Sequence, residues 1–453
     1  MRAITNRPVL FSKNTTLLLD CCLLFIFLTA SFDTFLNIKI SGYSIRICNL
    51  LMVFFSAVVF LFSLFSEVKF KIRLLGFWSF LVWVIFLSFF VQNSIIIQRG
   101  LGYHLWLIIF FGFIIALALY VNRITHFEKI FILYLNSFTI VAFLTLIQFT
   151  LALFGFEALI YYYFQSGIPR VHGLSYEPSY FSTYLIVPWT FHFLLYFSKN
   201  EELKKKTKNN FTLLLLTLVI FLSFSRMGIL LVGLIVGYKS LSIICKTFAS
   251  KKIRISEASF MGIIFIAAAG ILTMAVIYSK KFISVFEGLP FFSNYAHSAT
   301  IRLDDFMNTW QVFLESPWEG YSLGGIAPAI ARMKGYGSLT QEVVKNTEGM
   351  CILLEVLAAS GIIGFLFFCL FLGKLLLSSK QLSRIRYPAL NSTLSLYFTG
   401  HQLLIAGLIA QLILLCMNQN ILRNYLWIHI AIVNLSFFSL KDAYITNKQK
   451  ENE

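Results

Sequence analysis

Long runs of apolar residues, separated by short polar segments, form the pattern of this chain from end to end. A helix needs about 20 mostly apolar residues to span the hydrocarbon core of a bilayer, and most of these runs approach or exceed that length. The pattern predicts about twelve spans, at residues 16–32, 47–65, 74–93, 103–121, 130–156, 179–197, 211–224, 227–245, 258–279, 350–377, 394–418 and 424–440. We therefore expect an all-α polytopic membrane protein, with residues 1–453 forming a single transmembrane helical domain.

Two polar segments between the predicted spans are longer than the others, residues 157–180 and residues 280–349. The second lies before the tenth span and is rich in Gly, Ser, Asn and charged residues. Loops of this length are more often functional than passive, although a solvated cap is the alternative. Phe306, Trp310 and Phe313 recur at helical spacing, which predicts a short helix over about residues 302–314. We expect residues 280–349 to form a large extracytoplasmic loop that carries short helices.

Composition supports the membrane assignment: 58% of the residues are hydrophobic and only 13% are charged, which excludes a soluble globule and a disordered chain. The net charge of +17 resembles that of a nucleic-acid-binding protein. With a cytoplasmic N-terminus, however, about 25 of the 37 Lys and Arg residues fall in cytoplasmic segments. The positive-inside rule therefore explains the charge, predicts that both termini are cytoplasmic, and leaves no need for a nucleic-acid partner.

Neither cysteine nor histidine shows a metal-binding pattern. The seven Cys residues fall in or beside apolar runs without a C-x-x-C pair, and the seven His residues are scattered. The sequence also has no nucleotide-binding loop. We expect no bound metal and no cofactor.

In this topology several charged or titratable residues gather on the outer side: Arg170, His172, Glu177, Arg226, Arg302 and Glu348. Arginine stays charged and offers a fixed fork of donors that matches phosphate oxygens, so three converging arginines would suit a diphosphate. A nearby carboxylate or imidazole could take a proton from a hydroxyl nucleophile. These parts fit group transfer from a lipid diphosphate, with arginine stabilising the leaving group in place of a metal.

Each of these residues also has a simpler interpretation. Glu177 precedes Pro178 and Ser179 and could cap the start of the sixth span. His172 could serve only as a hydrogen-bonding residue of the loop, Glu348 could be a solvated interfacial charge, and Arg226 could be a topological anchor. Buried charges in apolar runs, such as Asp20, should be paired or face a cavity.

Three sequence blocks resemble the bacterial O-antigen polymerase and ligase superfamily. The first is R-x-x-G-x-x-x-E-P-S at residues 170–179, and the second is S-x-S-R-x-G at residues 223–228. The third begins at Arg302, passes through P-W-E-G-Y-S-L-G-G at residues 317–325, and ends at a span containing G-I-I-G-F at residues 361–365. Their order, spacing and shared outer placement make the resemblance fairly specific over about residues 160–375.

The resemblance implies a metal-independent glycosyltransferase in the bacterial cytoplasmic membrane, with both donor and acceptor linked to undecaprenyl diphosphate. By similarity, Arg170, Arg226 and Arg302 would bind the diphosphate, and the catalytic candidates are Glu177, His172 and Glu348. The partners implied are the lipid-linked glycans and the lipid bilayer, with chain-length regulator and flippase proteins as further candidates.

One departure from the family pattern separates two functions. Ligases of this superfamily usually carry a His-Asn pair just before the tenth span, where this chain has Asn346, Thr347 and Glu348. The E-P-S triplet also looks more like that of polymerases. We therefore expect a polymerase that joins repeat units of a surface polysaccharide (O-antigen, capsule or exopolysaccharide). The alternatives are an O-antigen ligase and a lipid-linked oligosaccharide flippase or transporter. A transporter would place its charged residues near the bilayer midplane, whereas these candidates lie at the outer ends of spans.

Overall fold

The computed structural model describes residues 11–35, 37–40, 43–65, 72–121, 124–156, 164–165, 168–250, 257–262, 297–344, 347–383, 392–417 and 421–451. The helices of the first half are α1 (Lys13–Leu28), α2 (Ile47–Phe65), α3 (Phe77–Phe89), α4 (Ile97–Tyr120), α5 (Ile124–Leu153), α6 (Pro178–Tyr196) and α7 (Glu201–Lys206). Those of the second half are α8 (Asn209–Leu222), α9 (Arg226–Ser250), α12 (His297–Glu315), α13 (Ile326–Met333), α14 (Gln341–Val344), α15 (Ile352–Leu376), α16 (Ser378–Ser383), α17 (Ser392–Met417) and α18 (Asn424–Glu451).

Helices account for nearly all of this fold. Two short antiparallel hairpins interrupt them, β1 (Asn37–Ile40) with β2 (Tyr43–Arg46), and β3 (Phe164–Gln165) with β4 (Ile168–Pro169). Within the described ranges, seven helices are long and apolar enough to cross a membrane. The expected class, an all-α polytopic membrane protein, is confirmed. The count of twelve spans stays a prediction, and most of the ninth predicted span lies outside the described residues.

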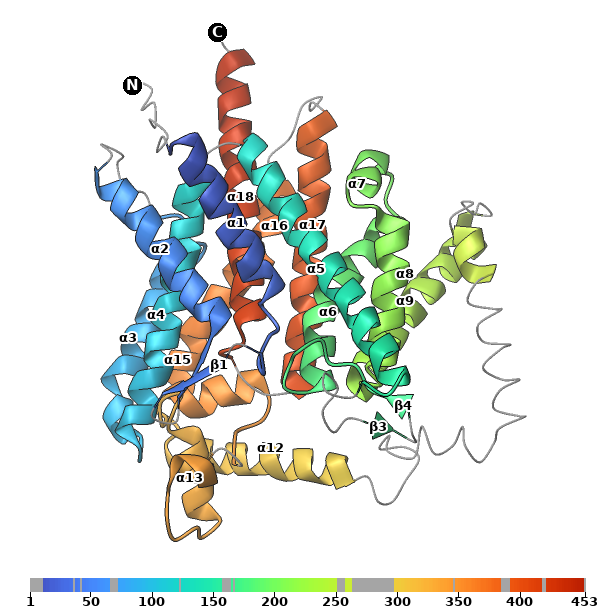
Figure 1. Cartoon of the computed structure of the whole chain (residues 1–453). Coiled ribbons are helices and arrows are strands. Elements are labelled where there is room, and N and C mark those ends of the chain that lie inside the picture. Colours follow the sequence, from blue (N-terminus) through green and yellow to red (C-terminus); the bar gives the residue numbers. More distant parts are fainter. Residues whose placement is uncertain are drawn as a thin grey trace, which may run out of the picture.

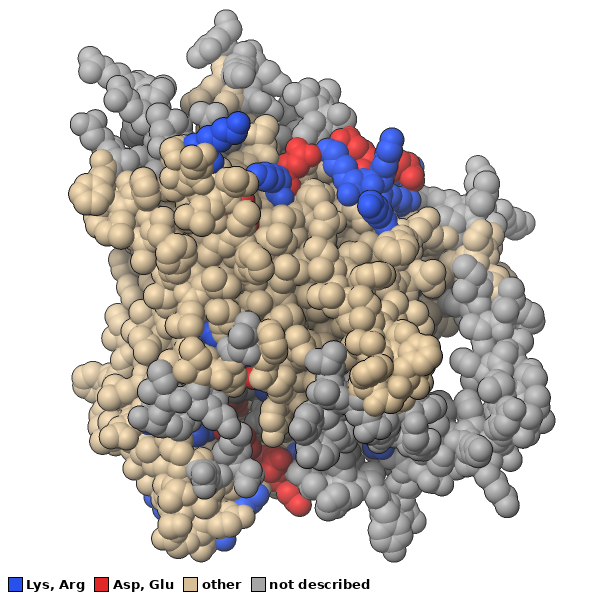
Figure 2. All heavy atoms as spheres, viewed as in Figure 1, with Lys and Arg blue, Asp and Glu red and all other residues tan. Residues whose placement is uncertain are grey.

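The helices form a bundle whose two ends differ in character. Figure 1 shows that α1 begins and α18 ends at the same end of the bundle as α7, while α12, α13 and the β3–β4 hairpin lie at the opposite end. Figure 2 shows Lys and Arg gathered with a few acidic residues at the α7 end, above a band of this face that is almost free of charge. We refer to the opposite end as the α12 end. It corresponds to the side that the charge pattern predicts to be extracytoplasmic.

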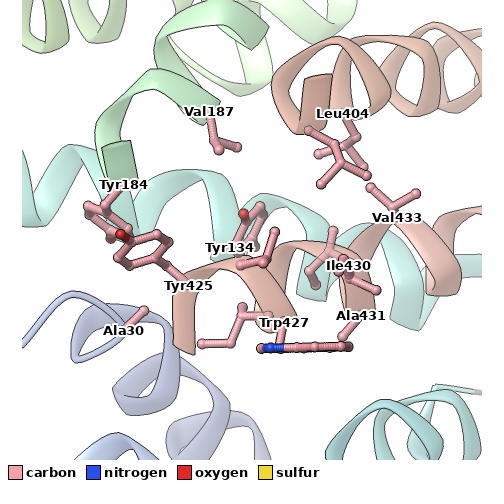
Figure 3. Packing of buried hydrophobic residues seen from close by; sticks show 14 of the residues in the cluster. Ala30, Tyr134, Tyr184, Val187, Leu404, Tyr425, Trp427, Ile430, Ala431 and Val433 are labelled. Carbon is pink, nitrogen blue, oxygen red and sulfur yellow. The ribbon is translucent and has the colours of Figure 1, made fainter. Parts of the chain in front are cut away.

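Buried aromatic residues of the central helices pack within a largely aliphatic core. Trp427 of α18 is buried and stacks on Phe110 of α4, with ring centroids 5.6 Å apart. Figure 3 shows Tyr184 of α6 and Tyr425 of α18 side by side, with their ring centroids 5.9 Å apart. This contact joins the helix after the first sequence block to the last helix of the chain.

Buried charges inside the apolar runs are paired, as expected. Asp20 of α1 accepts a hydrogen bond from Tyr120 Oη at 2.6 Å and forms an ion pair with Lys129. Glu355 of α15 accepts a hydrogen bond from the Ile421 backbone N–H at 3.0 Å. Both pairings satisfy carboxylates that would otherwise be costly to bury.

Helix α15 is broken at Gly361, and the third sequence block fills the break. Gly361 has φ 58° and ψ −173°, a conformation that is essentially restricted to glycine. The Pro317 carbonyl accepts a hydrogen bond from the Ile362 N–H at 2.8 Å, and the Tyr321 and Ser322 N–H groups donate to the carbonyls of residues 358 and 359. Because the inserted backbone is satisfied in this way, it is tolerated inside the protein. The insertion fixes the segment that leaves α12 to the end of the bundle.

Candidate functional site

The first sequence block, residues 170–179, follows a fixed backbone path at the α12 end. Gly173 has φ 53°, and a Cβ atom there would lie 2.3 Å from a ring carbon of Phe181. The next carbonyl, that of Leu174, accepts hydrogen bonds from the N–H groups of Asp33 and Thr34 at 3.0 and 3.2 Å. The glycine of this block is therefore required by both backbone conformation and space.

Arg170 contacts the second sequence block directly. Its Nε donates to the Ser223 carbonyl at 3.3 Å and its Nη2 donates to the Phe224 carbonyl at 3.2 Å. These carbonyls belong to the turn between α8 and α9, and Arg226 is the first residue of α9. The structure thus brings Arg170 against the turn from which Arg226 extends, although the two lie 56 positions apart in the sequence.

The remaining residues of the second block shape that turn. Ser223 Oγ accepts from the Ser225 N–H at 3.2 Å, and Ser225 Oγ accepts from the Gly228 N–H at 3.4 Å. A Cβ atom on Gly228 would lie 1.7 Å from Ser182 Oγ of α6. The start of α9 therefore packs tightly on α6, which holds Arg226 at the same end of the bundle as the first block.

Arg302 lies on α12 and contacts a different element. Its Nη1 donates to the Met417 carbonyl at 2.9 Å, at the end of α17. Helix α12 packs on α15 and lies across the α12 end rather than along the bundle (Figure 1). The three predicted arginines therefore share one end of the molecule. The described contacts join Arg170 to the turn before Arg226 and hold Arg302 at the end of α17.

Glu177 and His172 differ in their surroundings. Glu177 is half-buried at the N-cap position of α6, but its side chain caps no backbone N–H and accepts a hydrogen bond from Ser179 Oγ at 3.0 Å. His172 is buried, and its Nδ1 lies 2.7 Å from the Ser175 carbonyl. The histidine therefore shapes the loop, while the carboxylate of Glu177 is more accessible.

Glu348 pairs with a buried arginine that is not among the residues predicted from the sequence. It forms an ion pair with Arg99 of α4, whose side chain is 7% exposed. Arg99 also donates to Gln341 Oε1 at 3.1 Å and to Tyr103 Oη at 2.8 Å. The pair ties the segment before α15 to α4.

A second charged cluster, whose residues were likewise not predicted from the sequence, adjoins the first block. We call it the Asp33 cluster; it consists of Asp33, Arg46 and Arg423. Asp33 Oδ1 lies 2.9 Å from Arg46 Nε, and Asp33 Oδ2 lies 3.2 Å from Arg423 Nη1. The Tyr176 N–H donates to the same carboxylate at 3.3 Å, so the cluster is attached to the residue that precedes Glu177.

Arg423 is the buried anchor of this cluster. Its guanidinium carbon lies 3.6 Å from the centroid of the Tyr180 ring, a cation–π arrangement. Burial disfavours the charged form of Arg423, but the nearby carboxylates of Asp33 and, more weakly, Glu177 hold its pKa above the usual value. Arg423 is therefore charged at any working pH.

One signal in the sequence could have identified these residues. Asp33 directly follows the first predicted span, Arg46 directly precedes the second, and Arg423 directly precedes the last. In the predicted topology all three lie on the outer side, as does Arg99. Positive charge at the outer ends of spans is disfavoured by the positive-inside rule, which makes these arginines unusual.

Part of the chain matches a known protein family. Residues 211–369, about a third of the chain, match the sequence model of a family described as O-antigen ligase. The matched range contains Arg226, Arg302 and Glu348, whereas Arg170, His172 and Glu177 precede it. No curated protein matches the sequence. Within the described ranges, no three His, Cys, Asp or Glu side chains are grouped in a way that could hold a metal ion.

Proposed function

Because residues 211–369 match a family described as O-antigen ligase, and the sequence blocks resemble the polymerase and ligase superfamily, we propose that the protein is a glycosyltransferase that polymerises a surface polysaccharide. Its substrates would be oligosaccharide repeat units linked to undecaprenyl diphosphate, joined at the outer face of the membrane. The observation that carries the proposal is the contact between Arg170 and the turn that precedes Arg226. It brings guanidinium groups from two separate sequence blocks to one end of the bundle.

In the proposed reaction, a hydroxyl oxygen of the acceptor sugar attacks the anomeric carbon of the donor. A new C–O bond forms, the bond between that carbon and the diphosphate oxygen breaks, and undecaprenyl diphosphate leaves with the electron pair. Arg170, Arg226 and Arg302 would stabilise the charge on the leaving group, so it needs no proton to depart. The hydroxyl proton passes to a carboxylate.

Glu177 is our choice for that carboxylate. It lies seven residues after Arg170 in the first block. Its side chain is half-buried, and the Ser179 hydroxyl donates to one of its oxygens. Glu348 is the weaker candidate, because Arg99 already occupies its carboxylate. His172 is weaker still, because it is buried and its Nδ1 contacts the Ser175 carbonyl.

Ligation of a finished glycan to another acceptor is the second candidate, and the description of the matched family favours it. Both reactions use the same donor and the same leaving group, so the arginines do not separate them. The argument for polymerisation is that Glu348 and its neighbours stand where ligases of the superfamily usually carry a His-Asn pair. A flippase or transporter would need neither a general base nor arginines that stabilise a leaving group.

Gel analysis of the glycan from a deletion strain separates these functions. Loss of a polymerase should leave single repeat units on the final acceptor, and restoring the gene should restore the ladder of longer chains. Long chains retained on the lipid carrier would indicate a ligase instead. Repeat units trapped on the cytoplasmic face would indicate a flippase. Either of these two results would contradict the proposal.

A further inference from the structure

We propose that Arg46 binds a phosphate of a polyprenyl diphosphate and that Asp33 orients its guanidinium for this purpose. The inference rests on the proposed function, because it assigns an additional residue to the site that binds the lipid-linked diphosphate. The ligand class is the diphosphate headgroup of a lipid-linked glycan.

The first argument is the state of the Arg46 side chain. Its Nε forms an ion pair with Asp33 at 2.9 Å, and the side chain is 23% exposed. Among the described residues, none accepts a hydrogen bond from its two terminal nitrogens. A guanidinium paired with one carboxylate at its Nε side leaves its two terminal nitrogens available for a bidentate contact with phosphate oxygens.

The second argument is charge. Arg46 and Arg423 share the single carboxylate of Asp33, so the cluster carries an excess of positive charge. Arg423 is 7% exposed and covers the Tyr180 ring, so it cannot reach out to a ligand. Arg46 is therefore the member of the cluster that is able to bind an anion from outside.

The third argument is position. Asp33 accepts a hydrogen bond from the Tyr176 N–H, next to Glu177, and Leu174 accepts hydrogen bonds from the backbone N–H groups of Asp33 and Thr34. The same loop begins at Arg170, which contacts the turn before Arg226. The loop of residues 170–180 thus contacts both the turn before Arg226 and the Asp33 cluster, and it carries Glu177 next to the cluster. A phosphate bound by Arg46 would lie beside this loop.

The backbone of Arg46 is fixed on both sides, because Arg46 ends strand β2 and directly precedes α2.

The test measures binding of undecaprenyl diphosphate and undecaprenyl phosphate to the purified full-length protein in lipid nanodiscs. The wild type should bind the diphosphate more tightly than the monophosphate. Arg46→Gln should weaken diphosphate binding by about 10- to 100-fold, as expected for lost hydrogen bonds between charged groups, and should leave the monophosphate less affected. Arg46→Lys should lose most of the preference for the diphosphate over the monophosphate, because lysine lacks the two-pronged donor group that contacts two phosphate oxygens.

Arg73→Gln is the matched control. Arg73 is also partly buried, at 16% exposure, and forms an ion pair with one aspartate, Asp442 of α18. Asp442 lies in the second half of α18, the helix that ends at the end of the bundle opposite α12 (Figure 1). Its substitution should leave the affinity for both lipids unchanged. Inorganic diphosphate, added as a competitor, distinguishes a site for a soluble anion from one that requires the lipid.

Three other results would overturn the inference. Equal loss of affinity for both lipids in the Arg46 variants would indicate a merely structural role and overturn the inference. Unchanged diphosphate affinity would also overturn it, while a wild type that binds the lipid and makes polymer would leave the proposed function standing. A wild type that binds neither lipid would overturn both. If the Arg46→Gln protein does not accumulate in the membrane, the diphosphate affinity of the Arg46→Lys protein tests the inference instead, because lysine keeps a positive charge beside Asp33.

Discussion

The arginine side chains at the α12 end differ in their contacts with the protein. Arg170 donates two hydrogen bonds, to the carbonyls of Ser223 and Phe224, and Arg302 donates to the Met417 carbonyl. Arg99 and Arg423 are buried and paired with carboxylates. A guanidinium has five N–H donors in a rigid fork, so one side chain can brace the protein and still present donors to a ligand. This double use predicts that lysine cannot replace these arginines.

Arg170→Lys, Arg226→Lys and Arg302→Lys should each reduce polymer formation by roughly 10²–10³, the usual effect of losing one preorganised donor to a transition-state charge. The measurement is the glycan ladder on a gel at matched protein level. Arg332→Lys is the control, because Arg332 is 49% exposed and paired with Glu315 on the surface. Full-length polymer from all three variants would show that these arginines do not stabilise the leaving diphosphate.

Substitution of Glu177 should lower activity, whereas substitution of Glu348 should lower stability. Glu177→Gln should lower the rate of transfer by roughly 10²–10⁴ with little change in thermal stability, because the proton acceptor is lost. Glu348→Gln should instead lower stability, by up to roughly 3 kcal/mol, because it leaves the buried Arg99 without its ionic partner. Activity and melting temperature of each purified variant decide this. A nearly silent Glu177→Gln would show that Glu177 only begins the helix.

At the level of elements, the break in α15 links the third sequence block to the bundle. Residues 317–322 hydrogen-bond to the broken helix, and Asn93 Nδ2 donates to Glu319 Oε2 at 3.1 Å from the segment before α4. A Cβ atom on Gly324 would lie 2.5 Å from the Arg99 carbonyl carbon. The P-W-E-G-Y-S-L-G-G sequence is thus a packing motif that positions α12 and Arg99, which explains its spacing without giving it a chemical role.

Gly361→Ala should destabilise the protein by roughly 1–3 kcal/mol or more, since the backbone conformation is nearly exclusive to glycine. A Cβ atom there would also lie 2.2 Å from the Trp318 carbonyl oxygen. Gly373→Ala in the same helix is the control: a Cβ at Gly373 meets nothing within 4 Å, and alanine favours the helix. Thermal unfolding of the purified variants measures the difference. Equal melting temperatures would exclude a structural role for the break.

For the whole molecule, the arrangement of the two ends predicts the topology. The α7 end carries Lys204, Lys205 and Lys206, and the α12 end carries the candidate site. By the positive-inside rule, the α7 end should face the cytoplasm. In a cysteine-free background, an impermeant thiol reagent added to intact cells should label Asp304→Cys and spare Lys205→Cys, both of which replace exposed residues. The opposite labelling pattern would place the candidate site in the cytoplasm and exclude it from extracytoplasmic polymerisation.

The sequence by itself determined the helical membrane class, because the length of an apolar run and its hydrophobicity are local properties of the chain. The helices α2, α6 and α18 begin within one residue of their predicted positions. The sequence also indicated a resemblance to the superfamily, and residues 211–369 match the model of a family described as O-antigen ligase.

The tertiary structure decided which charged side chains meet. Asp33 and Arg423 lie 390 positions apart, and Arg99 and Glu348 lie 249 positions apart. Periodicity and spacing carry no information on such pairs, since the packing of distant helices sets their distance. The hydrogen bonds of Arg170 to the α8–α9 turn and the break in α15 likewise depend on contacts between separate helices. Local pattern fixes each helix, whereas the site arises where helix ends from across the chain come together.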